Sequence, residues 1–382
     1  MNTATPALPV TDEERVELVR LRRDFHRHPE LGFHEVRTSG IVAARLKELG
    51  YEVREGLGGT GVTGQKGRGG RALFVRADMD ALPIREENDV EYRSTNDGVM
   101  HACGHDTHTA IALAAAARFA KAAFPGRLRF GFQPAEEVGQ GAEKMMGDGA
   151  LEGVDAVLGL HVWNSMPVGK VGVTEGAAMA AVDDFDITVH GRGGHAAEPQ
   201  EAEDPIVAAA GIIRDLQTIV SRRVDPFQTA VLSVTWIEGG SAYNVIPEKA
   251  MLRGTIRTFD EGVRNEIHRR VREIVGAKGT VEIRKMTRVL VNDPRMCRIV
   301  REAAASVVGK ENIITDERTM GGEDFASMLA AKPGCFFFVG SQSPGGAYPH
   351  HHPRFDVDER ALAIGLEVMT RAVRVYLERG FE

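Results

Sequence analysis

In Leu73-Phe-Val-Arg-Ala-Asp-Met-Asp-Ala-Leu-Pro83, a short apolar strand runs into an acidic turn. An apolar run of this length, bounded by turn residues, is typical of a buried strand. Strands of the same kind are predicted at 127–132, 156–160 and 335–340, and helices at 109–121 and 359–378, among others. Strands that alternate with helices predict a mainly parallel sheet with helices on both faces, and therefore an α/β fold.

Polar residues cluster where these strands end. In open α/β sheets, ligand sites form beyond the carboxyl ends of the strands. The segments that reach this edge carry Asp78 and Asp80, Glu136 and Glu137, His161, and the run His350–His352. We therefore expect one functional site at this edge, although the spacing within the histidine run does not choose among its members.

A further stretch gathers soft and borderline metal ligands: Met100-His-Ala-Cys-Gly-His-Asp-Thr-His108. Cys103 and His105 are separated by one residue, so both can reach a metal from an irregular loop. Thiolate, imidazole and carboxylate groups are the ligands that a borderline-soft divalent ion binds. Packing alone does not explain the cluster, because burying several histidines in a core mainly adds a desolvation cost. The alternative is a structural thiol beside a capping histidine.

Glu136 and Glu137 form a pair with two possible roles. Adjacent side chains on extended backbone point in opposite directions, so one carboxylate can bind metal while the other faces the metal-bound water. A carboxylate can take the proton of such a water during attack. A solvated acidic loop is the alternative. One of Asp78 and Asp80 could orient a ligand or the base, with a capped turn before Pro83 as the alternative.

Residues 183–291 show a different order of predicted strands and helices. The predicted order is β-α-β-β-α-β, which is the split βαβ of ferredoxin-like domains. We expect this segment to be an insert, so that 1–182 and 292–382 form one domain and 183–291 form another.

Two glycine-rich turns of the insert carry His195 and Asn244. Such loops can bring a polar side chain over a substrate carbonyl, but glycine and asparagine also serve turns for conformational reasons alone. Arg257 could pair with a substrate carboxylate through two hydrogen bonds. On the residues alone, a solvated strand face explains Arg257 better.

Composition limits the partners. The 382 residues carry a formal net charge of −7, with a pI near 6.0, which argues against nucleic acid. Only three cysteines are present, so a disulfide framework is not expected and a reducing compartment fits. We see no signal peptide in residues 1–14, and the longest apolar run, 110–117, is too short to span a bilayer. We expect a cytoplasmic protein that binds neither nucleic acid nor membrane.

Eight motifs extend nearly from end to end of the chain. They are Arg27-His-Pro-Glu-Leu-Gly-Phe33, Asp78-Met-Asp-Ala-Leu-Pro-Ile84, Met100-His-Ala-Cys-Gly-His-Asp106, Gln133-Pro-Ala-Glu-Glu137, Gly193-Gly-His-Ala-Ala197, Asn244-Val-Ile-Pro247, Gly322-Glu-Asp-Phe325 and His351-His-Pro-Arg-Phe355. Together they resemble the N-acyl-amino-acid amidohydrolase family of hippurate hydrolases, bacterial aminoacylases and auxin-conjugate hydrolases. This family is a branch of the co-catalytic dinuclear metallopeptidases, with carboxypeptidase G.

The resemblance implies a metallopeptidase catalytic domain with a dinuclear metal site and an inserted ferredoxin-like lid and dimerisation domain. The ligand positions match Cys103, which we favour as the bridging ligand, His105, Glu137, His161 and His351. Glu136 matches the general base, and Asp80 the carboxylate that supports the site from behind. His195 matches the lid histidine that polarises the scissile carbonyl, supplied in dimers by the other subunit. Asn244 and Arg257 match substrate-contacting positions.

The implied activity is hydrolysis of N-acyl amino acids to a carboxylic acid and a free amino acid, by Glu136-assisted attack of metal-bound hydroxide. Two divalent ions of zinc, manganese, nickel or cobalt would serve as cofactors. A homodimer or a dimer of dimers is expected. The alternatives are a dipeptidase or other C–N hydrolase of the same superfamily, and a metal-binding protein without catalysis.

Two details accompany the resemblance. Family members often show His-Ala-Ala-x-Pro-His where this chain has His195-Ala-Ala-Glu-Pro-Gln200, a departure that concerns substrate preference. Within Met100–His108, only His105 among the histidines is assigned to the metal, and Asp106 is expected to cap the helix that follows.

Overall fold

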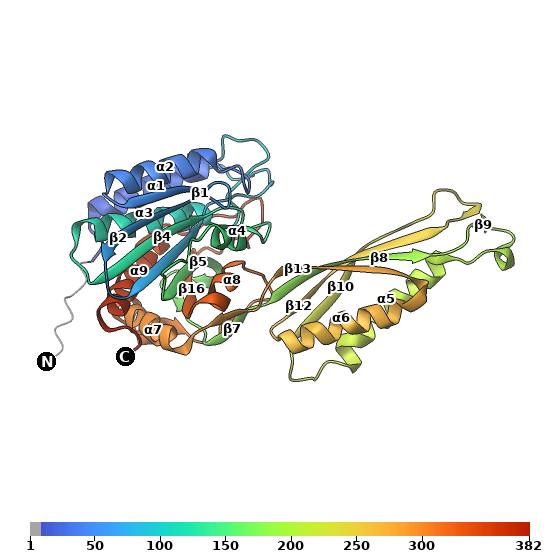
Figure 1. The fold of residues 1–382 in the computed structure, drawn as a ribbon. Coiled ribbons are helices and arrows are strands. Elements are labelled where there is room, and N and C mark those ends of the chain that lie inside the picture. The colour runs from blue at the N-terminus through green and yellow to red at the C-terminus, as the bar shows by residue number, and fades with distance from the viewer. Residues whose placement is uncertain (1–8) are drawn as a thin grey trace. The chain divides into compact units, whose positions relative to one another are not determined.

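The computed structural model describes residues 9–382. Residues 1–8, within the stretch where no signal peptide is expected, lie outside the described residues. The chain divides into two compact units (Figure 1). Unit 1 comprises the chain up to Gly176, Val291–Arg318 and Asp324–Glu382, and unit 2 comprises Ala177–Leu290 and Thr319–Glu323.

Unit 1 is built on an eight-stranded sheet in the order β1-β2-β4-β3-β5-β16-β6-β15. The strands are β1 (Glu52–Leu57), β2 (Gly61–Arg68), β3 (Ala72–Asp78), β4 (Gly126–Gln133), β5 (Ala156–Pro167), β6 (Val171–Gly172), β15 (Ile313–Ile314) and β16 (Gly334–Gln342). The central strands β4, β3, β5 and β16 run parallel, and β1 and β2 form an antiparallel hairpin at one edge. The predicted α/β class with a mainly parallel sheet is confirmed.

Helices cover both faces of this sheet. Phe337 on β16 belongs to the main hydrophobic core, on which α3, α7 and α9 pack. The ring of its neighbour Phe336 points to the other face, 5.4 Å from the ring of Phe325 in α8, which packs against α4. The helices of unit 1 are α1 (Asp12–Arg27), α2 (Val36–Glu48), α3 (His105–Lys121), α4 (Gly141–Gly147), α7 (Pro294–Val308), α8 (Phe325–Ala331) and α9 (Arg360–Arg379), with a 3₁₀ turn at Lys310–Asn312.

Unit 2 has its own core and a four-stranded antiparallel sheet in the order β10-β12-β8-β13. Its chain order is β8 (Ala181–His190), α5 (Pro205–Arg222), β10 (Ala230–Gly239), β12 (Lys249–Thr258), α6 (Glu261–Val275) and β13 (Gly279–Thr287), with 3₁₀ turns at Pro199–Glu201 and Gly276–Lys278. This is the β-α-β-β-α-β order of a ferredoxin-like fold. A separate ribbon pairs β9 (Gly194–His195) with β11 (Val245–Ile246). Strands β7 (Gly176–Met179) and β14 (Leu290–Asn292) lie where the chain passes between the units.

Two element boundaries differ from the sequence prediction. Helix α3 begins at His105 rather than at residue 109, because its N-cap is Gly104 in the left-handed region, with no side-chain cap. The usual signal of a helix start is therefore missing from the sequence. Strand β5 continues to Pro167, so His161 lies inside the strand, because the parallel pairing with β16 extends through Trp163.

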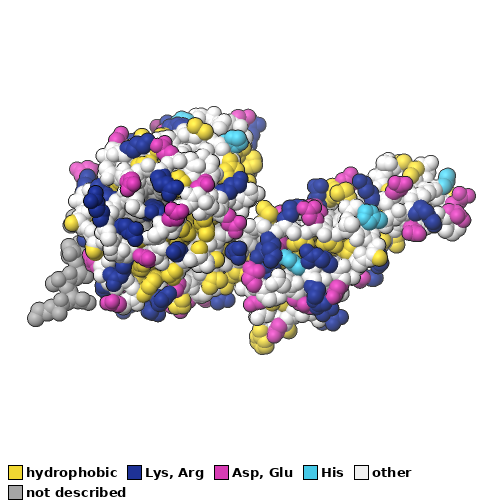
Figure 2. All heavy atoms as spheres, in the orientation of Figure 1, with side chains coloured by type: hydrophobic (Ala, Val, Ile, Leu, Met, Phe, Trp, Pro, Cys, Tyr) yellow, Lys and Arg dark blue, Asp and Glu magenta, His cyan; other side chains and the backbone are white. Residues whose placement is uncertain are grey.

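The surface carries charges of both signs. On the face shown in Figure 2, basic and acidic side chains are interspersed over each unit. Within residues 9–382, no helix combines the length and the apolar character needed to cross a membrane.

Candidate metal centre

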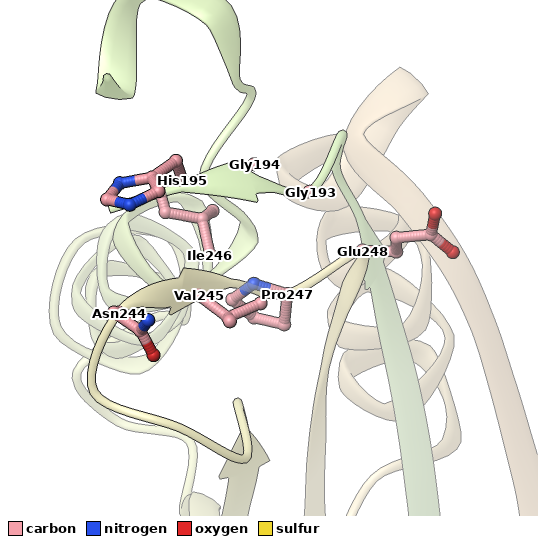
Figure 3. Close-up of a pocket in the computed structure, with 8 residues that line it drawn as sticks. All are labelled: Gly193, Gly194, His195, Asn244, Val245, Ile246, Pro247 and Glu248. Carbon is pink, nitrogen blue, oxygen red and sulfur yellow. The ribbon is translucent and has the colours of Figure 1, made fainter. Parts of the chain in front are cut away.

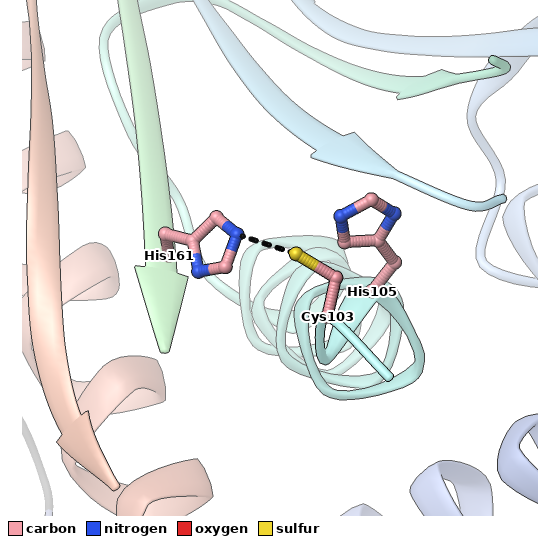
Figure 4. A group of neighbouring side chains, drawn as sticks. All are labelled: Cys103, His105 and His161. Atoms are coloured by element: carbon pink, nitrogen blue, oxygen red, sulfur yellow. Dashed lines mark hydrogen bonds between the residues drawn. The ribbon is translucent and has the colours of Figure 1, made fainter. Parts of the chain in front are cut away.

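Cys103, His105 and His161 come together in unit 1 (Figure 4). Cys103 lies on the loop before α3, His105 is the first residue of α3, and His161 lies on β5. Cys103 Sγ is 3.4 Å from His161 Nε2, and one ligand atom of each residue lies within 4.8 Å of the other two. A Cβ at Gly104 would stand 2.5 Å from Val162 Cγ2, so the close approach of this loop to β5 requires a glycine.

Hydrogen bonds decide which ring nitrogen of each histidine faces the cluster. His105 Nδ1 lies 2.8 Å from the backbone oxygen of Asp80, and His161 Nδ1 lies 2.6 Å from that of Val162. A carbonyl only accepts, so each Nδ1 carries a proton and each Nε2 keeps its lone pair in the neutral ring. His105 Nε2 is buried and has no hydrogen-bond partner among the described residues. This is the arrangement of a metal-binding histidine, which donates its other N–H to a carbonyl or carboxylate.

Asp80 holds the two glutamates in place. Its Oδ1 accepts the N–H of Glu136 and its Oδ2 accepts the N–H of Glu137, both at 3.0 Å. Glu137 Oε1 is buried, lacks a hydrogen-bond partner within residues 9–382 and lies 3.8 Å from His105 Nε2. Glu136 Oε1 accepts the N–H of Asp324 at 3.4 Å, and one Glu136 oxygen lies within 4.8 Å of ligand atoms of His105 and Glu137. One glutamate therefore faces the ligands, and the other carboxylate is held beside them.

The run His350–His352 contributes one residue to the cluster. His351 Nε2 lies 3.4 Å from Glu137 Oε2, and His351 forms a group with Glu137 and Cys103. His350 instead has its Nε2 3.0 Å from the backbone oxygen of Val162. His351 adopts a φ of 65°, which is uncommon for a residue other than glycine and is found where the surrounding structure enforces it, often at functional sites.

The electrostatics of the cluster favour a cation. Burial alone lowers the pKa of His105, but the carboxylates of Asp78, Asp80 and Glu137 outweigh it and raise this pKa to about 10. Burial, followed by the charge of Glu137, holds the pKa of the Cys103 thiol well above its usual range. A divalent ion held by these residues would supply positive charge and stabilise the thiolate, and Glu137 Oε1 is available to it as a ligand.

The ligands fall into two groups that share a residue. The groups are Cys103 with His105 and His161, and Cys103 with Glu137 and His351. The donor set of one thiolate, three imidazoles and a carboxylate fits borderline divalent ions. The protein thus has ligand groups for two metal ions.

The other histidines of Met100–His108 do not face the cluster. His108 Nε2 accepts the N–H of Val162 at 3.0 Å, and its Nδ1 lies 2.6 Å from Asp78 Oδ1, so both ring nitrogens are occupied. His101 is fully buried, and burial lowers its pKa to about 4.

Asp106 does not cap α3, and that expectation was wrong. Asp106 Oδ2 accepts a hydrogen bond from Arg22 Nε at 3.0 Å and lies 2.8 Å from His26 Nδ1. Asp106 therefore anchors the first turn of α3 to α1 through a buried ion pair.

A buried arginine behind the cluster escaped the sequence analysis. Arg76 on β3 places Nη1 2.7 Å from Asp78 Oδ2, Nε 2.9 Å from Gln133 Oε1 and Nη2 3.2 Å from Asp324 Oδ1. The signal was present, because Arg76 interrupts the apolar run 73–77. An arginine on a buried strand is almost always paired.

His195 and Asn244 meet on the ribbon of unit 2. They line a pocket of about 490 Å³, together with the glycines before His195 and the residues after Asn244 (Figure 3). His195 Nδ1 accepts the N–H of Ala197 at 3.0 Å, so Nε2 carries the proton of the neutral ring. Glu198 and Gln200 follow on an exposed turn.

Arg257 is not brought to His195 and Asn244 within unit 2. It lies near the end of β12, whereas the ribbon adjoins the start of that strand. Its Nη1 donates to the backbone oxygen of Met320 at 3.3 Å and its Nε to Thr255 Oγ1 at 3.1 Å. Burial lowers the pKa of Arg257.

Comparisons with known proteins show the family of the chain. A model of peptidase family M20/M25/M40 matches residues 74–375. N-acetyl-L-cysteine deacetylase of Bacillus subtilis (strain 168) is 43% identical over 359 residues, which cover 91% of this chain and 85% of that protein. IAA-amino acid hydrolase ILR1-like 4 of Arabidopsis thaliana is 38% identical over 378 residues, which cover 94% of this chain and 86% of that protein.

A solved structure gives the same result. The YXEP protein of Bacillus subtilis, described as a dinuclear metal binding peptidase from the M20 family, is 36% identical, with a TM-score of 0.83, over 96% of this chain and 99% of that one. The resemblance carried by the sequence motifs is confirmed. The chain is a hydrolase that acts on amide bonds, and it belongs to peptidase family M20/M25/M40.

Proposed function

We propose that the protein hydrolyses N-acyl amino acids that keep a free α-carboxylate, releasing a carboxylic acid and an amino acid. The printed activities of two relatives support this, one a deacetylase of N-acetyl-L-cysteine and the other a hydrolase of IAA-amino acids. The observation that carries the proposal is the placing of two adjacent glutamates by Asp80, with Glu137 among the metal ligands and Glu136 beside them.

The chain's own residues account for the proton transfers. Two divalent ions, when bound, lower the pKa of water and polarise the scissile carbonyl. Glu136 accepts a proton from the attacking water while the water oxygen bonds to the acyl carbon. Glu136 then passes this proton to the amine nitrogen as the C–N bond breaks. Asp80 accepts the backbone N–H groups of Glu136 and Glu137, which lie in a turn rather than on the extended backbone that the sequence predicted, and one carboxylate oxygen of each lies near His105.

Unit 2 serves as a lid in this proposal. His195 donates its Nε2–H to the carbonyl oxygen as negative charge develops there. Asn244, on the same ribbon, contacts the substrate beside His195. Arg257 binds the α-carboxylate through its guanidinium, which contacts Thr255 and Met320 within unit 2.

The positions of His195 and Arg257 support a dimeric active site. Arg257 lies eight positions along β12 from Lys249, which is at the ribbon end, a distance of about 26 Å at about 3.3 Å per residue. An N-acyl amino acid is too short to touch both in one copy of unit 2. We therefore propose a homodimer in which His195 of each subunit serves the site of the other.

The test is a hydrolysis screen of the purified protein, loaded in turn with zinc, manganese, nickel or cobalt. Substrates are N-acetyl and N-benzoyl amino acids, the same compounds with the α-carboxylate converted to an amide, and dipeptides. We expect turnover of the N-acyl amino acids and loss of it when the carboxylate is masked. Faster cleavage of dipeptides would favour a dipeptidase, and metal binding without any turnover would contradict catalysis.

A further inference from the structure

A second group of side chains with metal-ligating atoms adjoins the first and shares His105. Asp78, His105 and His108 have ligand atoms close enough together to hold an ion. Asp78 Oδ2 lies 3.5 Å from His105 Nε2, the nitrogen that faces Cys103 and Glu137. All three side chains are buried. A carboxylate at this distance from a ligand nitrogen competes for the ion unless it is otherwise engaged.

Two neighbours engage the Asp78 carboxylate. Its Oδ1 lies 2.6 Å from His108 Nδ1, and its Oδ2 accepts a hydrogen bond from Arg76 Nη1 at 2.7 Å. The charge of Arg76 is therefore what offsets a buried anion beside the metal ligands.

Arg76 is itself fixed from several sides. Its side chain is fully buried and also contacts Gln133 at the end of β4 and Asp324 at the start of α8. Asp324 in turn donates its N–H to Glu136. A guanidinium held by Asp78, Gln133 and Asp324 does not swing away from Asp78 without disturbing the structure around Glu136.

We propose that Arg76 is a positioning residue that excludes Asp78 from the metal centre and so keeps His105 committed to Cys103 and Glu137. The inference rests on the metal-dependent function proposed above. Without Arg76, the freed Asp78 carboxylate would bind an ion together with His105 and draw it away from the Cys103 thiolate.

The test compares Arg76→Met with the double variant Arg76→Met/Asp78→Asn. The double variant removes the competing carboxylate, while asparagine still offers His108 an acceptor. Each protein is titrated with Co²⁺, and the near-ultraviolet charge-transfer band of cobalt bound to thiolate reports Cys103. We expect Arg76→Met to lose this band and to bind the ion about 10- to 100-fold more weakly. We expect the double variant to regain both.

Matched variants separate this role from a structural one. Arg264→Met removes another buried arginine, in unit 2, and should leave the cobalt band unchanged. If Arg76→Met does not fold, Arg76→Lys and Arg76→Gln replace it, and the lysine variant alone should keep the band, because it retains the charge beside Asp78. An unchanged band in Arg76→Met, or a double variant no better than the single one, overturns the proposal.

The readout is independent of substrate. A wild-type protein that shows the cobalt–thiolate band but cleaves no N-acyl amino acid would contradict the proposed function and leave the role of Arg76 standing. Among active variants, kcat should follow the cobalt band while KM changes little, since Arg76 acts through the metal ligands rather than on the substrate.

Discussion

The Nδ1 atom of His105 lies 2.8 Å from the backbone carbonyl oxygen of Asp80. Asp80 therefore acts on the site twice, because its carbonyl sets the tautomer of a metal ligand and its carboxylate holds the N–H groups of Glu136 and Glu137. The parallel pairing of β3 with β4 brings these segments together, with Asp78 opposite Gln133. Asp80, two residues after the end of β3, thus positions His105 and the backbone of both glutamates.

Asp80→Asn should weaken both metal binding and catalysis. The amide can accept one of the two glutamate N–H groups but presents a donor to the other, so Glu136 and Glu137 lose their common support. We expect metal affinity and kcat each to fall about 10- to 100-fold, measured by metal titration and by hydrolysis of an N-acyl amino acid. Asp293→Asn is the control, since Asp293 caps α7, where asparagine caps as well. Equal losses in both variants would contradict the role of Asp80.

Glu136→Gln should separate metal binding from catalysis. Glutamine keeps the size of the side chain but cannot take a proton, so kcat should fall by about 10²- to 10⁴-fold while two ions remain bound. Glu137→Gln should instead lose metal. Metal analysis and steady-state kinetics of the two variants check this, with the exposed Glu175→Gln as control. Near-normal turnover by Glu136→Gln would rule it out as the base.

The apolar runs along the chain predicted the sheet, because a strand that is buried on both faces carries its signal locally. The start of α3 could not be predicted in the same way, since Gly104 supplies a left-handed backbone and no capping side chain. Asp106 looked like a cap because aspartate at a helix start usually is one. Its partners, Arg22 and His26, lie 84 and 80 residues earlier in the chain, so only the tertiary fold brings them to it.

The same limit applies within the metal centre. The motifs pointed to Cys103 and His105, but the choice of His351 from three consecutive histidines depends on its left-handed backbone and its approach to Glu137. Arg76 could be noticed as a charge in an apolar strand, but not assigned. One of its partners, Asp324, is 248 residues away in sequence.

The stability of unit 2 should depend on acid through Asp183. This buried carboxylate contacts Arg264 Nε at 2.9 Å and His268 Nε2 at 2.6 Å. Burial alone would raise its pKa, but His268 and Arg264 lower it. Its folded pKa therefore lies below the unfolded value of about 3.9. The carboxylate contributes stability that is fully present above that pH and is lost as pH falls through the folded pKa.

Asp183→Asn tests this contribution. We expect a loss of about 3–5 kcal/mol at pH 7 that shrinks as the pH falls below about 4. Urea unfolding in a Trp163→Phe background measures it, because Trp236 then remains as the reporter of unit 2. Asp186→Asn, at a partly exposed ion pair, should cost no more than about 1 kcal/mol. A pH-independent difference for Asp183→Asn would contradict the assignment.

Mixed dimers decide whether His195 acts across a subunit interface. His195→Ala alone should lower kcat by about 10²- to 10³-fold, the cost of losing a donor to the developing oxyanion. A hybrid of a His195→Ala subunit with a Glu136→Gln subunit, purified through two affinity tags, should recover about half of the wild-type rate, because one of its two sites then has both residues.

The matched hybrid pairs a wild-type subunit with a His195→Ala/Glu136→Gln subunit and contains the same substitutions. It should be inactive if His195 is supplied by the partner, since neither site then has both groups. If His195 serves its own subunit, the two hybrids exchange their activities, so the pair of measurements distinguishes the arrangements without reference to absolute rates.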